Sequence, residues 1–355
     1  MNSEYFDLIK NDTILSRLDI KFIDPSSNSD HISALNSTAD IQANSYLTDY
    51  GHFYRYSEPF WLFQPSTIEE ALYGLRRLAT LNIRVCCRGS GHSMNGFSLP
   101  RNGEILFSTL KLQKVELCHS SYISVDSGVQ ILQLNRWLQL QNFQLPVVHD
   151  GCLAGPTVGG FVCAGGFGQA SIKKGGFWNH IKSMLVWFFS SGLRTITPND
   201  NDFWLICGCA KFDGVILSVD LFIEQIDHPL YFNNKNLKLH DSLSFCYESH
   251  PRNLWFTFIA PRYSQSLLKQ NIVRLHHEFA GYWDSLPPYL YIIKSMNSQC
   301  PPSFHSVQDV DLIAAGIWGN VDNVDIFKYI DKLLFKINQV SCKYSTLHRY
   351  WQSEL

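Results

Sequence analysis

Two glycine-rich segments constrain this chain more than any other feature. The first covers residues 88–96 and reads RGSGHSMNG, and the second covers residues 155–171 and reads GPTVGGFVCAGGFGQAS. Glycine tolerates positive φ and has no side chain, so clustered glycines expose backbone N–H groups and let the chain approach an anion closely. The two segments therefore indicate either ordinary turns or two loops that hold an extended anionic ligand.

The first glycine segment follows a predicted helix and a predicted strand. Ser66 and Thr67 precede two glutamates in the manner of a helix N-cap, and the spacing of the next leucines predicts a helix to about Leu81. The apolar run IRVCC, residues 83–87, predicts a buried strand that ends at Arg88. This places the glycine loop at the carboxyl end of a strand, where α/β folds bind ligands.

Strand and helix signals continue to residue 226 and then change in character. Strands are expected at 105–110, 122–128 and 144–148, a helix at 129–143, a β-hairpin limb turning at Ser191–Gly192, and a long strand before 226. From 227 glycine becomes rare, and 254–279 and 312–339 each read as strand, turn and helix. This predicts an antiparallel sheet with helices on one face. The expected organisation is an N-terminal extension (1–50), a first domain (51–226) and a short second domain (227–355).

Composition supports a globular protein and excludes several partner classes. Of the 355 residues, 45% are hydrophobic and only 17% are charged, which fits two well-buried domains and excludes disorder. The net charge of −2 and the lack of a basic stripe exclude a nucleic-acid partner. No secretory signal and no apolar run of membrane-spanning length is visible, so we expect a cytoplasmic protein without an integral membrane segment. The 10 cysteines lack the spacing of a zinc site, so no metal is expected.

Two common phosphate-binding motifs do not fit the first glycine segment. It contains Gly-x-Gly but no third glycine at the spacing of a Rossmann fingerprint, and Pro100 stands where a helix should begin. The Gly-Lys-Ser/Thr sequence of a P-loop is also missing. The remaining ligand-binding interpretation is a pyrophosphate clamp formed by residues 89–96 and 155–168, which suits a long ligand such as FAD.

Three separated segments carry a resemblance to a known family. They read RGSGHSMNGFSL, then TVGGFVCAGGFGQASIKKGGFWNHIKSM, then TITPNDNDFWLICGCAKFDGVILSVDLFI. In order and spacing, they resemble the FAD-binding domain of the vanillyl-alcohol-oxidase/p-cresol-methylhydroxylase (PCMH) superfamily. The likeness covers residues 60–226 and is greatest to decaprenylphosphoryl-ribose oxidases and sugar-1,4-lactone and alditol oxidases, with cytokinin-dehydrogenase-like features. It implies an α+β fold: a PCMH-type FAD-binding domain of two α+β subdomains, plus a short substrate domain.

The resemblance also implies which residues hold FAD. Two groups of backbone atoms would enclose the pyrophosphate, and a third would run beside the flavin ring. The implied contacts are Arg88, Gly89, Ser90, Gly91, His92, Ser93, Met94, Asn95 and Gly96 around the pyrophosphate; Thr157, Val158, Gly159 and Gly160 on its other side; Gly165, Gly166, Phe167, Gly168 and Gly151 at the ring; Val215 at the adenine end or ring edge; and Tyr344 as the family's aromatic residue near the chain end.

His92 stands where many oxidases of this superfamily bond a histidine nitrogen to the 8α carbon of the flavin. A neutral imidazole is a competent nucleophile, and an attached flavin gains oxidising power and cannot dissociate. The alternative is a loop histidine beside a noncovalent flavin. A second bond through cysteine is not expected, because Gly155 occupies the position where berberine-bridge-type enzymes have that cysteine.

The substrate side matches the family less well. Oxidising an alcohol requires a base for the hydroxyl proton and positive charge near the flavin. If Tyr344 matches the family's aromatic residue, the usual lysine position holds Leu347, so His348 is the candidate base and Lys343 the candidate charge. The alternative is that this stretch is an ordinary terminal segment. Asp150 resembles the proton-accepting aspartate of cytokinin dehydrogenases, although a turn-forming Asp-Gly is the commoner explanation of such a pair. Phe167 replaces a polar residue of the ribose oxidases and suggests a more apolar or aromatic substrate.

The function that the resemblance implies is an FAD-dependent oxidase or dehydrogenase. It would transfer hydride to flavin N5 from the CH–OH carbon of a small molecule such as a sugar, lactone or related alcohol, with O₂ or another compound as electron acceptor. One alternative is an amine-oxidising or natural-product tailoring flavoenzyme, which Phe167 favours. Another is a flavin-binding protein without turnover, which the short second domain and the missing lysine favour.

Overall fold

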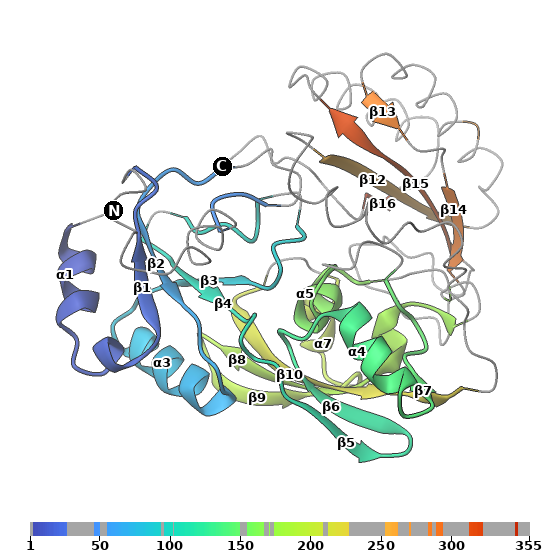
Figure 1. Ribbon diagram of the computed structural model, residues 1–355, viewed down its shortest axis with the longest axis horizontal. Helices are drawn as coiled ribbons and strands as arrows, with labels where there is room; N and C mark the ends of the chain where they lie inside the picture. The colour runs from blue at the N-terminus through green and yellow to red at the C-terminus, as the bar shows by residue number, and fades with distance from the viewer. Residues whose placement is uncertain are drawn as a thin grey trace.

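In the computed structural model, the described residues form three larger β-sheets and one two-stranded ladder (Figure 1). The structure describes residues 3–26, 46–49, 55–93, 96–101, 103–149, 155–166, 170, 174–208, 212–226, 253–261, 270, 283–285, 289–293, 312–321 and 345–346. Beyond residue 226 the description is of backbone pairing.

The first sheet has four strands in the order β1-β2-β4-β3, formed by Ile20–Ile23, Phe60–Phe63, Ile105–Ser108 and Val85–Arg88. β2, β4 and β3 are parallel, and β1 joins the edge of β2 antiparallel. Every residue of β2 and β4 is buried, as expected for central strands covered on both faces. The helix α1 (Ser3–Asn11) and the 3₁₀ turn η1 (Leu15–Arg17) precede β1. The predicted extension over residues 1–50 thus supplies a strand to this sheet.

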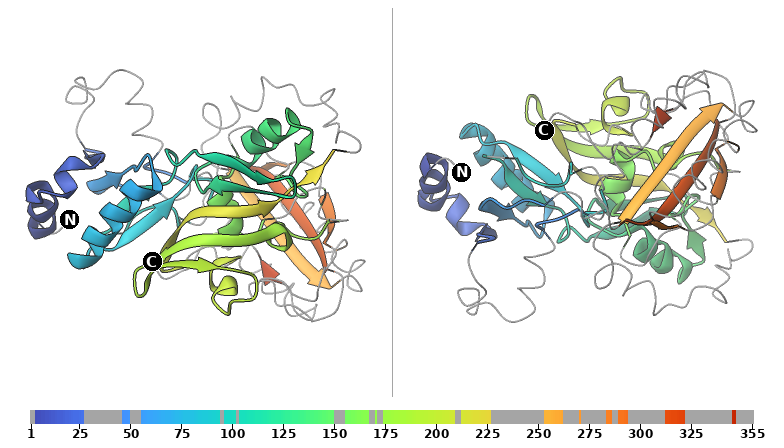
Figure 2. Two further views of the ribbon diagram at one scale, coloured as in Figure 1. Left: turned by 90° about the horizontal axis from the view of Figure 1, so that it is seen from below. Right: turned by 90° about the horizontal axis from the view of Figure 1, so that it is seen from above.

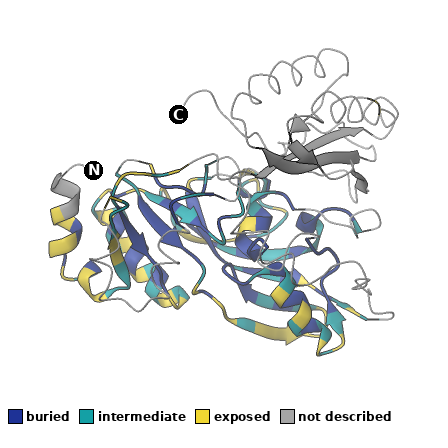
Figure 3. Ribbon diagram, turned by 45° about the horizontal axis from the view of Figure 1, so that its top comes forward, coloured by how far each residue is buried: buried dark blue, intermediate teal, exposed yellow. Residues whose placement is uncertain are grey.

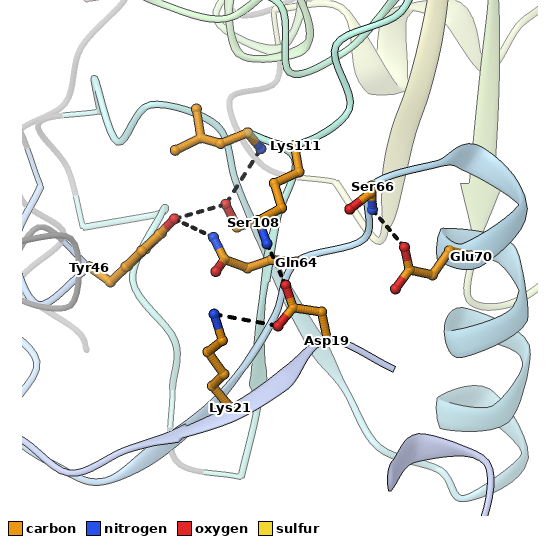
Figure 4. Close-up of polar contacts among 9 residues, drawn as sticks. Asp19, Lys21, Tyr46, Gln64, Ser66, Glu70, Ser108 and Lys111 are labelled. Carbon is orange, nitrogen blue, oxygen red and sulfur yellow. Dashed lines mark hydrogen bonds and ion pairs between the residues drawn. The ribbon is translucent and has the colours of Figure 1, made fainter. Parts of the chain in front are cut away.

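The helix α3 (Ile68–Thr80) connects β2 to β3 and confirms the capping prediction. The Glu70 amide donates to the Thr67 hydroxyl at 3.1 Å, and the Glu70 carboxylate accepts from the Ser66 amide at 2.7 Å (Figure 4). These two bonds satisfy amides that the first helical turn otherwise leaves unpaired. The buried face of α3, which includes Leu75 and Leu78, lies in the core of the first sheet.

Polar side chains form hydrogen bonds and ion pairs around this sheet. The Tyr46 hydroxyl accepts from the Gln64 amide at 2.7 Å and lies 3.3 Å from the Ser108 hydroxyl (Figure 4). On the exposed side, Asp19 pairs with Lys21 and Lys111. Because Tyr46, Gln64 and Ser108 are buried, their hydrogen bonds offset the cost of removing them from water.

The second sheet has five antiparallel strands in the order β5-β6-β10-β8-β9. Its members are Val115–His119, Tyr122–Asp126, Gly214–Phe222, Ile181–Phe188 and Gly192–Ile196. The helices α4 (Ile131–Gln139), α5 (Val158–Cys163) and α7 (Phe203–Ile206) and the 3₁₀ turn η3 (Phe177–His180) contribute buried side chains to one hydrophobic cluster with this sheet. In Figure 3 the buried colouring follows these two sheets, whereas the outer sides of α1 and α3 are exposed.

In this region one predicted strand is absent, and one observed strand was not predicted. Residues 144–148 are not a strand: only β7 (Phe143–Gln144) pairs, with β11 (Glu224–Gln225), and the rest is buried irregular chain. Pro146 has no N–H to donate, which explains why pairing stops before it. β5 was not predicted, because four of its five residues are exposed and a sheet-edge strand of this kind lacks an apolar alternation. The predicted hairpin turn at Gly192 is confirmed, with φ +77° there.

The third sheet confirms the predicted antiparallel sheet in the C-terminal part of the chain. β15 (Leu312–Val321) pairs antiparallel with β12 (Asn253–Pro261), β13 (Trp283–Ser285) and β14 (Tyr289–Ile293), and β12 pairs with β16 (Ser345–Thr346). In Figures 1 and 2 this sheet lies over the second sheet's half of the molecule, on the side that carries α4 and α5. The helices predicted after β12 and β15 lie outside the described residues.

An ion pair between α3 and the N-terminal segment makes the stability of this fold depend on pH. Asp12, 8% exposed, accepts from Arg77 Nε at 2.8 Å and from the amides of Ile14 and Leu15 at 2.9 Å. The hydrogen bond from Arg77, aided by the two amides, lowers the pKa of Asp12 against the opposing effect of burial. A carboxyl with a lowered folded-state pKa stabilises the fold above its unfolded pKa and loses that effect as the pH falls through its folded pKa.

Replacing Asp12 with asparagine is therefore expected to lower the free energy of unfolding most at neutral pH. The difference from the wild type should shrink as the pH falls below about 4, the ordinary aspartate range. Urea titrations of both proteins at several pH values measure it. A difference that is the same at neutral and acid pH contradicts the assignment.

Candidate functional site

The two glycine segments meet in the structure. The first follows β3, and the second forms the start of α5, which packs on the second sheet (Figure 1). A Cβ atom added to Gly89 would lie 2.2 Å from the Thr157 hydroxyl, so no larger residue fits there without displacing Thr157. The two segments expected to form a clamp thus lie in contact, with one on each of the first two sheets.

The first arm presents a run of backbone N–H groups. Within the described residues, no hydrogen-bond acceptor is paired with the amides of Gly89, Ser90 or Gly91. Gly91 has φ +73°, a left-handed backbone conformation of the kind found in anion-binding loops. Unpaired amides in such a turn fit an anionic ligand.

The Arg88 side chain holds this loop in place through hydrogen bonds. Its side chain, 5% exposed, donates to the Thr48 carbonyl at 2.8 Å and to the Ser98 carbonyl at 3.3 Å. The guanidinium also lies 5.6 Å from the centre of the Tyr46 ring. A Cβ atom on Gly91 would lie 2.0 Å from the guanidinium. The side chain of Arg88 therefore supports the loop through contacts within the protein.

Residues 46–49 were not recognised from the sequence as part of this site. The Asp49 carboxylate, in a residue only 2% exposed, accepts from the Gly96 amide at 2.9 Å and so closes the far end of the loop. Thr48 supplies the carbonyl that binds Arg88. The segment lies in a polar stretch without periodicity, so only its position in three dimensions identifies its role.

The second arm is fixed by hydrogen bonds around Thr157. Its hydroxyl accepts from the Gly160 amide at 3.3 Å, and the Gly159 amide donates to the Ser127 carbonyl at 2.9 Å. The Ser127 hydroxyl is buried and has no hydrogen-bond partner among the described residues. It lies beside Gly159, whose added Cβ would come within 2.8 Å of the Ser127 Cβ. A buried hydroxyl left unpaired between the arms fits a polar ligand group.

The second glycine pair lies on an aromatic cluster. Gly165 has φ +65°, and the Gly166 amide donates to the Phe161 carbonyl at 2.9 Å. A Cβ on Gly166 would lie 2.3 Å from the Phe161 ring, so this close approach requires glycine. Val215 is fully buried in the core beneath the first sheet.

The structure brings a second histidine to His92. The His92 and His149 rings have centroids 5.5 Å apart and are perpendicular, and His149 is only 7% exposed. On its other side His149 meets the Phe161 ring at 5.6 Å. Sequence reasoning passed over His149 because it follows a buried apolar run and carries no spacing signal of its own.

Cysteine is a poor alternative nucleophile beside the loop. Cys87 lies in β3, next to Arg88, and burial raises the pKa of its thiol well above the usual range. A protonated thiol is a weak nucleophile compared with a neutral imidazole. Cys87 is therefore a poorer candidate for bond formation than His92.

Within the described part of the chain, no group of His, Cys, Asp and Glu side chains could hold a metal ion. No helix of that part is long and apolar enough to span a membrane.

Several residues that the sequence predicts for the site lie outside the described part of the chain. The predicted residues that lie outside the described ones are Met94, Asn95, Asp150, Gly151, Phe167, Gly168, Lys343, Tyr344 and His348.

Comparison with known proteins agrees with this site. Residues 59–196 match the model of a family described as an FAD binding domain. An uncharacterized oxidoreductase from the fasciation locus of Rhodococcoides fascians is 27% identical over 224 residues, covering 60% of this chain and 49% of that protein. The D-arabinono-1,4-lactone oxidase of Yarrowia lipolytica is 27% identical over 174 residues, covering 48% of this chain and 32% of that enzyme. The chain thus spans half or less of the length of these curated relatives.

Solved structures share the fold. A cholesterol oxidase variant from Brevibacterium sterolicum aligns with a TM-score of 0.65 at 9% identity, covering 92% of this chain and 86% of that one. The BBE-like 1 protein of Physcomitrella patens aligns with a TM-score of 0.50 at 13% identity, covering 95% of this chain and 62% of that one. The family match includes both glycine arms, and the shared fold agrees with the architecture expected from the sequence. Residues 59–196 match the family described as an FAD binding domain, and the chain is similar in sequence to oxidoreductases.

Proposed function

We propose that this chain is an FAD-dependent oxidase or dehydrogenase that acts on the CH–OH carbon of a sugar, a lactone or a related alcohol. The observation that carries the proposal is the run of amides at Gly89, Ser90 and Gly91, which have no acceptor among the described residues and lie near Thr157 and His92. FAD supplies the two-electron chemistry when bound. The chain supplies binding, orientation and protection from water.

In this proposal each glycine arm has its own part of FAD to bind. The amides of Gly89–Gly91 neutralise the pyrophosphate charge, and the Ser127 hydroxyl gains the partner that it otherwise lacks. We assign the backbone at Gly165 and Gly166 to the flavin ring. An added Cβ at Gly166 would meet the Phe161 ring, so glycine is required at that position.

We further propose that His92 is bonded to FAD through a ring nitrogen. Forming the bond to the C8 methyl carbon removes one hydrogen from that methyl group and one from the imidazole N–H. Two protons and two electrons are released in total, and the electrons pass through the flavin to an acceptor such as dioxygen. The raised pKa of the Cys87 thiol, caused mainly by its loss of contact with water, supports histidine as the attachment point.

The proposed substrate class is based on the name of a related enzyme. The lactone oxidase of Yarrowia lipolytica acts, by its name, on D-arabinono-1,4-lactone, and its likeness to this chain supports a polyhydroxylated or lactone substrate. We assign proton acceptance to His348 and positive charge near the flavin to Lys343, with Asp150 as the alternative proton acceptor. These three assignments rest on the sequence.

The test is anaerobic mixing of the purified protein with sugars, lactones, primary and secondary alcohols, and amines. Bleaching of the flavin absorbance by an alcohol or a lactone is the expected result. Bleaching by amines alone overturns the CH–OH assignment in favour of amine oxidation. A fully flavin-loaded protein that no class reduces indicates a binding protein without turnover, and a protein that binds no flavin overturns the proposal altogether.

The Thr157 hydroxyl gives a further prediction with a matched control. Thr157→Val keeps the side-chain shape but removes the acceptor for the Gly160 amide, which should cost about 1 kcal/mol of stability. Thr67→Val removes the equivalent cap of α3, where Glu70 donates. Both variants should unfold at lower urea concentration, but only Thr157→Val should also weaken FAD binding, by about 10-fold, because Thr157 faces Gly89. Equal FAD affinity in the two variants contradicts the placement of Thr157 in the clamp.

A further inference from the structure

We infer that Lys174 and Glu224 are positioning residues, whose ion pair holds the second glycine pair, Gly165 and Gly166, in place at the flavin ring. The inference rests on the proposed function, which assigns this glycine backbone to the ring. Neither charged residue lies in a glycine segment, and the structure brings the two together from positions 50 residues apart in the chain.

Lys174 is held at three points by described residues. Its ammonium pairs with the Glu224 carboxylate at 2.6 Å, its amide donates to the Ala170 carbonyl at 2.9 Å, and its carbonyl accepts from His180 Nε2 at 3.0 Å. Burial lowers the pKa of His180, so its ring is neutral at neutral pH and donates this bond through Nε2–H. The side chain and the backbone of Lys174 are thus both fixed.

The Glu224 end of the ion pair belongs to paired strands. Glu224 lies on β11, directly opposite Gln144 of β7. One carboxylate oxygen accepts from the Gln144 side-chain amide at 2.9 Å, and the other binds Lys174. Because Gln144 is buried, its amide holds the carboxylate in one orientation. Lys174 therefore binds a carboxylate that strand pairing and Gln144 have already placed.

The 3₁₀ turn η3 connects this ion pair to the glycine pair. Its last residue, His180, donates to Lys174, and its first residue, Phe177, donates its amide to the Gly166 carbonyl at 2.8 Å. Phe177 is buried and packs on the Phe161 ring, with centroids 4.9 Å apart. A displacement of Lys174 therefore acts through one short turn on the carbonyl of Gly166.

The exposure of the ion pair favours a positioning role over a stabilising one. Its side chains are 42% and 28% exposed, and an ion pair so accessible to water contributes little to the stability of a whole fold. Its effect is therefore local and selects one position for the backbone at Gly166. The ion pair of Arg194 with Asp202 is 41% and 30% exposed, lies on β9 and at the start of α7, and provides a matched control.

The experiment inverts the charges of the pair one at a time and then together in the full chain. Lys174→Glu and Glu224→Lys each place like charges side by side, and each is expected to weaken FAD binding about 10-fold and to shift the visible absorption bands of the bound flavin. The double variant restores opposite charges and should return the FAD affinity to within about 3-fold of the wild type, with wild-type bands. Fluorescence titration with FAD and absorption spectra of the loaded proteins measure the two effects.

The control variants separate positioning from stability. Arg194→Glu and Asp202→Lys should lower the urea midpoint of unfolding as much as the single variants of Lys174 and Glu224 do. They should leave the FAD affinity within about 2-fold of the wild type and the flavin bands unchanged. Lys174→Met keeps a long side chain without a charge, and replaces Lys174→Glu in the comparison if the latter does not fold.

Two results overturn the inference. One is wild-type FAD affinity and wild-type flavin bands in the single variants of Lys174 and Glu224. The other is a double variant that regains the stability of the wild type but not its FAD affinity. A wild type that binds no FAD overturns the proposed function instead.

Discussion

Replacing His92 with alanine is expected to abolish the covalent bond to FAD completely while leaving FAD bound. Alanine has no nucleophile, and the neighbouring Cys87 cannot replace it, because burial keeps its thiol protonated. The pyrophosphate contacts come from backbone amides, which the substitution does not remove. After denaturation in acid, the wild-type pellet should stay yellow, whereas all flavin of His92→Ala should appear in the supernatant.

The control is His119→Ala, which removes an exposed histidine from β5 and should leave the pellet yellow. A yellow pellet from His92→Ala would show that another residue carries the flavin. A loss of flavin from the native His92→Ala protein would show that the bond, and not the amide clamp, provides the affinity.

Gly91→Ala is expected to weaken FAD binding by about 100-fold. Its Cβ would lie 2.0 Å from the Arg88 guanidinium, which hydrogen-bonds to Thr48 and Ser98. Moving the guanidinium breaks two hydrogen bonds to a charged group, at a combined cost of about 3 kcal/mol, and tilts the amides that face the ligand. The variant should therefore purify with little flavin.

Gly103→Ala is the matched control. Gly103 also has positive φ, at +84°, but an added Cβ would meet nothing within 4 Å. Both variants carry the same kind of backbone strain, of about 1 to 2 kcal/mol. Fluorescence titration with FAD measures the difference. Equal FAD affinity in Gly91→Ala and Gly103→Ala would falsify the assignment of the first glycine loop as the pyrophosphate site.

The parts of this fold that were predictable are those with a local physical signature. The cap formed by Ser66, Thr67 and Glu70 confirms the helix start, and the buried run before Arg88 confirms the strand that delivers the glycine loop. The glycine segments themselves were informative because two of them, far apart in the chain, needed the same explanation. Their meeting at Gly89 and Thr157 supports that explanation.

The parts that escaped prediction depend on tertiary packing. His149 and Asp49 have ordinary surroundings in the sequence, and only the folded chain brings them to His92 and Gly96. Burial alone did not make a strand of residues 145–148, because Pro146 prevents pairing. The strand β5 was missed for the opposite reason: its exposed residues carry no apolar alternation.

The most direct measurement of the central claim is to locate the flavin in the chain. Trypsin cleaves after Arg88 and Arg101, which releases the peptide GSGHSMNGFSLPR, residues 89–101. This peptide is expected to carry the whole mass of FAD less two hydrogen atoms, with fragment ions that place it on His92. A flavin found on any other peptide, or an unmodified peptide from a protein that holds FAD, contradicts this expectation.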